Sequence, residues 1–145
     1  FLALLALAHD VIIVCGIFSW LGIIYQVEID SLFAVALLTI AGYSVNDTVV
    51  VFDRIREIKK EDNLSNSEQV DIAVSATLTR TLYTSGTTLL PLLALILYGG
   101  STLYWFAIAL ALGVIIGSWS SIALAPSLLN LSNKYNNILN KSSDL

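Results

Sequence analysis

The feature that most constrains this chain is a long stretch without charged side chains. Residues 81–133 contain no Asp, Glu, Lys, Arg or His. A helix that crosses a membrane needs about 20 apolar residues, so this stretch is too long for one crossing and suits two. Residues 89–98 and 106–116 are apolar on every face, whereas a helix on the surface of a soluble domain has a polar face. The pattern therefore predicts a pair of helices in contact with lipid.

Two further apolar runs lie in the first part of the chain. Only 12% of all residues are charged, about half the share that is usual in soluble domains, and the mean hydropathy is +0.81. We therefore predict an all-α fold, a polytopic membrane bundle of four transmembrane helices. The predicted spans are residues 1–24, 31–52, 82–98 and 103–129.

A charged segment, residues 53–80, separates the second span from the third. In its second half Val70, Ala73, Val74 and Leu78 fall on one stripe at helical spacing, which predicts an amphipathic helix over residues 67–79 along the membrane face. Residues 130–145 are rich in Asn, Ser and Lys, which is typical of a flexible tail. The sequence thus predicts a membrane domain over residues 1–129 and a tail over residues 130–145.

The basic residues predict the orientation, because Lys and Arg prefer the cytoplasmic side of a membrane. They follow the second and fourth spans, at Arg54, Arg56, Lys59, Lys60, Lys134 and Lys141. The turns after the first and third spans contain no Lys or Arg. We therefore expect both ends of the chain, the charged segment and the tail to be cytoplasmic.

Composition also excludes some classes of function and structure. So few basic residues predict no nucleic-acid partner, and the single cysteine, Cys15, excludes a disulfide framework. We expect no metal site and no cofactor. Since the chain contains no methionine, we interpret it as an internal or C-terminal fragment of a longer protein.

Asp47 is the leading candidate for a functional residue. A charged side chain near the centre of a bilayer costs about 2.5 kcal/mol or more, so it is retained mainly where it faces protein and has a partner. Asp47 precedes Arg54 by seven residues, about 10 Å along a helix, which places it within the membrane in the cytoplasmic half. The alternative is an Asp that only ties helices together.

Two other ionisable residues could act with Asp47. Arg80 opens the third span, and an arginine beside Asp47 would favour the charged carboxylate, while loss of that contact would favour the neutral acid. Alternatively, Arg80 is a positive-inside anchor that reaches the head groups. Asp10 follows His9 in the first span and either extends a polar path toward Asp47 or lies in the head-group region.

Small residues recur at four-residue spacing in the fourth span, at Gly113, Gly117 and Ser121. Such spacing lets two membrane helices approach closely. We interpret these residues as a packing surface rather than as a chemical site.

A sixteen-residue segment, residues 42–57, reads GYSVNDTVVVFDRIRE and includes Gly42, Tyr43, Asn46, Asp53, Arg54 and Arg56. It resembles the signature of the SecF branch of the SecD/SecF family. Residues 8–10 (AHD), 79–82 (TRTL) and 84–88 (TSGTT) resemble the same family. The resemblance extends to about residue 129.

The resemblance implies a protein-export role rather than an enzyme. Members belong to the resistance-nodulation-division superfamily and lie in the bacterial plasma membrane, or in the thylakoid membrane of photosynthetic organisms. A SecD-type subunit, the SecYEG channel, exported preproteins and the lipid bilayer are the implied partners, and the proton-motive force is the implied energy source. Asp47 resembles the family's proton-relay aspartate and Arg80 the arginine coupled to it. The family's two earlier spans and its periplasmic domain have no counterpart in this sequence.

Three alternatives stay open. A proton-coupled small-molecule exporter would share the superfamily architecture. An intramembrane aspartyl protease would need two facing aspartates, which Asp10 and Asp47 could supply, but its Tyr-Asp and Gly-x-Gly-Asp elements are absent. A structural membrane subunit would have no proton role.

Overall fold

The computed structural model describes residues 2–58, 66–124, 126–129 and 131. They form four long helices: α1 (Leu2–Tyr25), α2 (Ser31–Ile58), α3 (Asn66–Tyr98) and α4 (Gly100–Trp119). A π-helical turn, Ser120–Leu124, continues α4. This part of the chain contains no strand, and all four helices are long and apolar enough to cross a membrane. The predicted fold class is confirmed.

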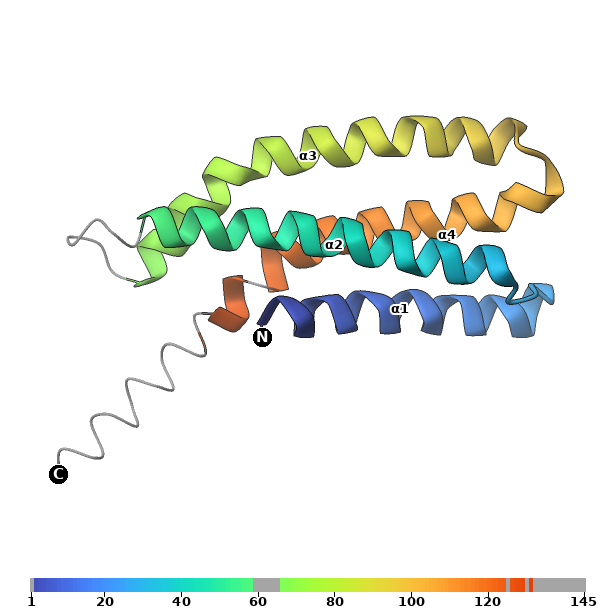
Figure 1. Cartoon of the computed structure of the whole chain (residues 1–145), viewed down its shortest axis with the longest axis horizontal. Coiled ribbons are helices and arrows are strands. Elements are labelled where there is room, and N and C mark those ends of the chain that lie inside the picture. The colour runs from blue at the N-terminus through green and yellow to red at the C-terminus, as the bar shows by residue number, and fades with distance from the viewer. Residues whose placement is uncertain (1, 59–65, 125, 130, 132–145) are drawn as a thin grey trace, which may run out of the picture.

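Helices α2 and α4 form the centre of the bundle, with α1 packed on one side and α3 on the other (Figure 1). Each helix runs antiparallel to the one before it, because the turns between α1 and α2 and between α3 and α4 are short. The N-terminus of α1, the C-terminal end of α2 and the start of α3 therefore lie at one end of the bundle. We call this end, which carries the charged residues after Asp47, the charged end.

The helices differ from the predicted spans at the charged end. α2 continues past residue 52 to Ile58, and α3 already begins at Asn66. The predicted amphipathic helix over residues 67–79 thus forms the first turns of α3 instead of a separate element. The reason is packing: Val70 and Ala73 are buried against Val51 and Ile55 of α2, so the helix has a protein surface to follow. Residues 59–65 and nearly all of the predicted tail, residues 130–145, lie outside the described residues.

Local signals explain both short turns. The carboxylate of Asp30 accepts a hydrogen bond from the Phe33 backbone N–H at 3.0 Å and so caps the start of α2. At the other turn Gly100 has φ of +74°, a backbone conformation that glycine adopts without the steric penalty of a Cβ.

The interior of the bundle is divided along its length. One apolar cluster, which includes Phe18, Phe33 and Ile40, fills the half nearer the two short turns. A second cluster, which includes Val51 and Ile55, fills the charged end. Between them α2 buries three polar residues, Ser44, Asp47 and Thr48, on the face that carries Ile40 and Val51. The fold therefore places a polar layer between two apolar ones.

Candidate functional site

The polar layer draws side chains from every helix and from the π-helical turn. All its members are buried: Asp10, Ser44, Asp47, Thr48, Thr81, Ser85, Ser118, Ser120 and Ser121. We call this set the buried polar layer. Polar groups removed from water are costly unless they are hydrogen-bonded, and in lipid water is not available as a substitute partner. Apart from Thr48, whose hydroxyl has no hydrogen-bond partner, the layer meets this requirement internally.

Asp47 lies in this layer with 8% of its surface exposed. Its two carboxylate oxygens accept hydrogen bonds from different elements. Thr81 Oγ1 of α3 donates to Oδ1 at 3.3 Å, and Ser121 Oγ of the π-helical turn donates to Oδ2 at 3.0 Å. Asp47 therefore connects α2 with both α3 and the end of α4 through neutral hydroxyl groups.

Arg80 is exposed and does not form a direct ion pair with Asp47, although it lies within electrostatic reach of that carboxylate. It precedes Thr81, so the residue that touches Asp47 is its neighbour. Arg80 lines a pocket of about 240 Å³ at the charged end, together with residues of α2 and α3. The other lining residues are Val50, Asp53, Arg54, Glu57, Ala76 and Thr77. Charged groups thus approach the layer from this end.

Asp10 is fully buried between α1, α2 and the π-helical turn. Its Oδ2 accepts hydrogen bonds from Ser44 Oγ at 2.6 Å and from Ser120 Oγ at 2.7 Å. Its Oδ1 lies 3.1 Å from Nδ1 of the half-buried His9. Asp10 therefore lies inside the bundle, in contact with α2 and the π-helical turn.

Sequence reasoning missed most of the hydroxyl groups that surround the two carboxylates. The sequence indicates no role for Ser44, Thr81 and Ser120, and it predicts only a packing role for Ser121. Their signal is weak, because serine and threonine in helices often bond back to the preceding turn. The Ser121 hydroxyl, which has a single proton to donate, lies within hydrogen-bond distance of both the Ser118 carbonyl oxygen, at 2.9 Å, and Oδ2 of Asp47, at 3.0 Å.

The signature residues divide between the inside and the outside of the bundle. Tyr43 is half-buried, and its hydroxyl donates to Ser85 Oγ at 3.2 Å. Gly42 and Asn46 are exposed on the opposite face of α2. Asp53, Arg54 and Arg56 are exposed at the charged end, where Arg54 pairs with Glu57 at 2.7 Å.

Gly113 and Gly117 lie where α4 approaches α2. A Cβ atom at Gly113 would overlap the Ile40 side chain. At Gly117 it would lie 3.4 Å from Cβ of Ser44 and 3.7 Å from Oδ2 of Asp10. α4 therefore lies close to Ser44 and Asp10 at Gly117, although a Cβ there would make only ordinary van der Waals contacts.

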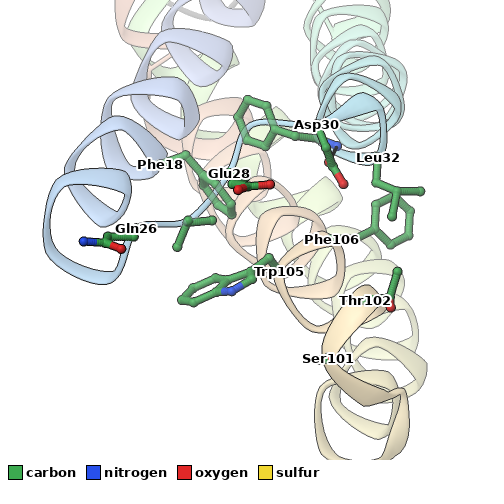
Figure 2. Close-up of a pocket in the computed structure, with 11 residues that line it drawn as sticks. Phe18, Gln26, Glu28, Asp30, Leu32, Ser101, Thr102, Trp105 and Phe106 are labelled. Carbon is green, nitrogen blue, oxygen red and sulfur yellow. Dashed lines mark hydrogen bonds between the residues drawn. The ribbon is translucent and has the colours of Figure 1, made fainter.

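A second pocket, of about 290 Å³, lies at the other end of the bundle (Figure 2). Phe18, Trp105 and Phe106 line its apolar side, and Glu28 and Asp30 lie at its polar side. Phe33 of this pocket precedes Asp47 by 14 residues, about 21 Å along α2, so the pocket is separate from the buried polar layer. In the part of the chain that the structure describes, no group of His, Cys, Asp and Glu residues could hold a metal ion.

Comparison with known proteins identifies the family. Residues 1–134 match the family described as "Protein export membrane protein SecD/SecF, C-terminal". The chain is 81% identical over 130 residues to the protein translocase subunit SecF of Prochlorococcus marinus, covering 89% of this chain and 40% of that protein. It is 50% identical over 127 residues to SecF of Synechocystis, covering 87% of this chain and 40% of the relative.

Two solved structures support the same assignment. The chain superposes on SecDF in its super-membrane-facing form with a TM-score of 0.89 and 43% sequence identity, over 99% of this chain and 19% of that one. It also superposes on SecDF from Thermus thermophilus with a TM-score of 0.85 and 46% identity, over 92% of this chain and 18% of that one. The chain thus spans about two fifths of the SecF relatives' length. It belongs to the SecD/SecF family and corresponds to the C-terminal membrane portion of SecF.

Proposed function

We propose that this chain is the membrane part of a Sec accessory subunit that couples the proton-motive force to protein export, with Asp47 as the proton carrier. The observation that carries the proposal is the setting of Asp47. Its carboxylate is buried in a membrane-spanning helix and held by two neutral hydroxyls, Thr81 and Ser121, and not by a direct ion pair. A hydroxyl donates to a carboxylate and can accept from a carboxylic acid, so both protonation states have partners.

Protonation of Asp47 would change the contacts between helices. Thr81 and Ser121 donate to the charged carboxylate, and such charge-assisted hydrogen bonds are stronger than neutral ones. Uptake of a proton weakens both bonds together and so loosens α2 from α3 and from the end of α4. A membrane potential supplies about 2.3 kcal/mol per charge per 100 mV, so a few protons provide enough free energy for a conformational change.

In this proposal Arg80 is the electrostatic partner of Asp47. It precedes Thr81, and it faces the charged-end pocket that contains Asp53, Arg54 and Glu57. A small rotation of α3 would alter the distance between the guanidinium and the carboxylate. Arg80 would thereby favour the charged form of Asp47 in one arrangement of the helices and release it in another.

The proposed partners are a SecD-type subunit, the SecYEG channel and exported preproteins. Two observations support the SecD-type partner. A relative named SecDF carries both names in a single chain. In addition, α2 exposes Asn46 next to Gly42, and a neighbouring protein helix would provide a hydrogen-bond partner for this polar side chain within the membrane. The proposed location is the plasma membrane or the thylakoid membrane, with the charged end in the cytoplasm, since the basic residues gather there.

The other candidate functions receive less support. A small-molecule exporter of the same superfamily would be expected to match exporters, whereas the relatives described above are translocase subunits. A protease would need two carboxylates that share one water molecule, whereas Asp10 and Asp47 each bind their own pair of hydroxyls. We therefore propose that the chain is not an enzyme.

The test is export by the intact subunit that contains this chain, assayed in membrane vesicles with and without a proton gradient. We expect Asp47→Asn to abolish the stimulation by the gradient while leaving the gradient-independent export unchanged. Ser127→Ala is the matched control, because its exposed hydroxyl binds only the Ala123 carbonyl. If Asp47→Asn retained full stimulation, the chain would instead be a structural subunit.

A further inference from the structure

Asp10 is the one buried polar residue of α1. Both of the hydroxyls that bind it belong to segments that also form the surroundings of Asp47. Ser44 precedes Asp47 by three residues on α2, and Ser120 is the neighbour of Ser121 in the π-helical turn. Asp10 therefore contacts the site of Asp47 from two sides without bonding to Asp47 itself.

We infer that Asp10 is a positioning residue that holds the π-helical turn so that Ser121 is directed at Asp47, and that it is not a second proton carrier. The inference deepens the proposed function and rests on it. Asp10 acts as an acceptor that joins α1, α2 and the end of α4 at one point.

The pattern of hydrogen bonds requires an acceptor at this position but not a charge. Ser44 and Ser120 donate to the same oxygen, Oδ2, and an amide oxygen can also accept two hydrogen bonds. The remaining oxygen, Oδ1, faces Nδ1 of His9, which can accept from an amide NH₂ in one tautomer. Asparagine would therefore satisfy every contact that Asp10 makes.

The π-helical turn is where such a positioning contact is needed. It begins at Ser120, the residue that binds Asp10, and Pro126 lies two residues after its end at Leu124. Proline cannot donate a backbone hydrogen bond and crowds the preceding turn, which accounts for the widened helix before it. A π-helical turn is less regular than an α-helix, so the orientation of Ser121 depends on side-chain contacts such as the one from Ser120 to Asp10.

Close packing keeps this junction together. α4 passes close to Ser44 and Asp10 at Gly117, where an added Cβ would lie in van der Waals contact with both residues. Ser120 also donates weakly to the Gly117 carbonyl at 3.3 Å. Because Ser120 donates directly to Asp10, a change at Asp10 would alter a contact of the π-helical turn itself.

The experiment compares Asp10→Asn, Asp10→Ala and Ser120→Ala in the intact subunit, with Ser127→Ala as the control. Gradient-stimulated export is measured in vesicles. The carboxylic acid stretching band of Asp47, assigned by its loss in Asp47→Asn, is followed by infrared spectroscopy. We expect Asp10→Asn to keep export within about twofold of wild type and to leave the band in place. We expect Asp10→Ala and Ser120→Ala to lower export about fivefold or more and to shift the band.

Two outcomes overturn the inference. Loss of gradient stimulation in Asp10→Asn as complete as in Asp47→Asn would mean that the charge of Asp10 is required. Unchanged export and an unchanged band in Ser120→Ala would mean that the contact does not position Asp47, and this variant decides the matter if Asp10→Ala fails to fold. Full stimulation in Asp47→Asn would refute the proposed function instead.

Discussion

The contact between α2 and α4 at Gly113 allows a stability prediction with an internal control. A Cβ at Gly113 would overlap the side chain of Ile40, which is 1% exposed and belongs to the apolar cluster nearer the short turns. Ile40 is buried within this cluster, so either its side chain or the two helices would have to shift. Overpacking of this kind costs about 1–3 kcal/mol. Replacing glycine by alanine within a helix also gains up to about 1 kcal/mol from helix propensity.

Gly16 of α1 separates these two effects. No atom lies within 4 Å of a Cβ built at Gly16, so Gly16→Ala reports the propensity gain alone. We expect Gly113→Ala to be less stable than Gly16→Ala by about 1–3 kcal/mol. The measurement is unfolding in mixed detergent micelles, followed by the helical signal in circular dichroism.

A double-mutant cycle with Ile40→Ala completes this test. Ile40→Ala alone leaves a cavity and should cost about 2–5 kcal/mol. In that background the overlapping atoms are gone, so Gly113→Ala should be neutral or stabilising, like Gly16→Ala. Equal stability of the two alanine variants in the wild-type background, or an equal penalty for Gly113→Ala with and without Ile40, would refute the packing argument.

Three further predictions concern polar side chains. Thr48→Val should raise the free energy of unfolding by about 1 kcal/mol, because the buried Thr48 hydroxyl has no partner; a loss of stability in the same unfolding assay would show that it has one. Tyr43→Phe should lower the free energy of unfolding by about 0.5–1.5 kcal/mol, because the hydrogen bond to Ser85 is lost; an unchanged midpoint of the unfolding transition would contradict that bond. Arg54→Ala should change stability by less than about 1 kcal/mol, because its pair with Glu57 is about half exposed, and a larger loss in thermal unfolding would contradict this.

The fold could be predicted from the sequence because few backbone structures are stable in lipid. Every backbone polar group must be satisfied within the segment, so an apolar run of sufficient length has to be a helix. The composition of residues 53–80 was misleading in one respect. The charged residues of this segment indicated a surface helix over residues 67–79, separate from the span over residues 82–98. Instead, α3 is one continuous helix, because Val70 and Ala73 pack on α2.

The candidate site was accessible only in part. Asp47 and Asp10 are conspicuous because carboxylates are rare in membrane spans. Their partners depend on the packing of helices that are distant in sequence: Ser120 lies 110 residues after Asp10, and Ser121 lies 74 residues after Asp47. The spacing of serine and threonine residues along one helix does not indicate which carboxylate on another helix their hydroxyl groups contact. The exposed position of Arg80, with Thr81 in the place nearest Asp47, could not be predicted from a single sequence for the same reason.

The most direct test of the account is proton flux itself. The intact subunit, reconstituted with its SecD-type partner in liposomes that contain a pH-sensitive dye, is exposed to an imposed potential. Wild type and Ser127→Ala should acidify the lumen at the same rate, and Asp47→Asn should reduce the rate to that of empty liposomes. Undiminished proton entry in Asp47→Asn would contradict the claim that this carboxylate carries the proton.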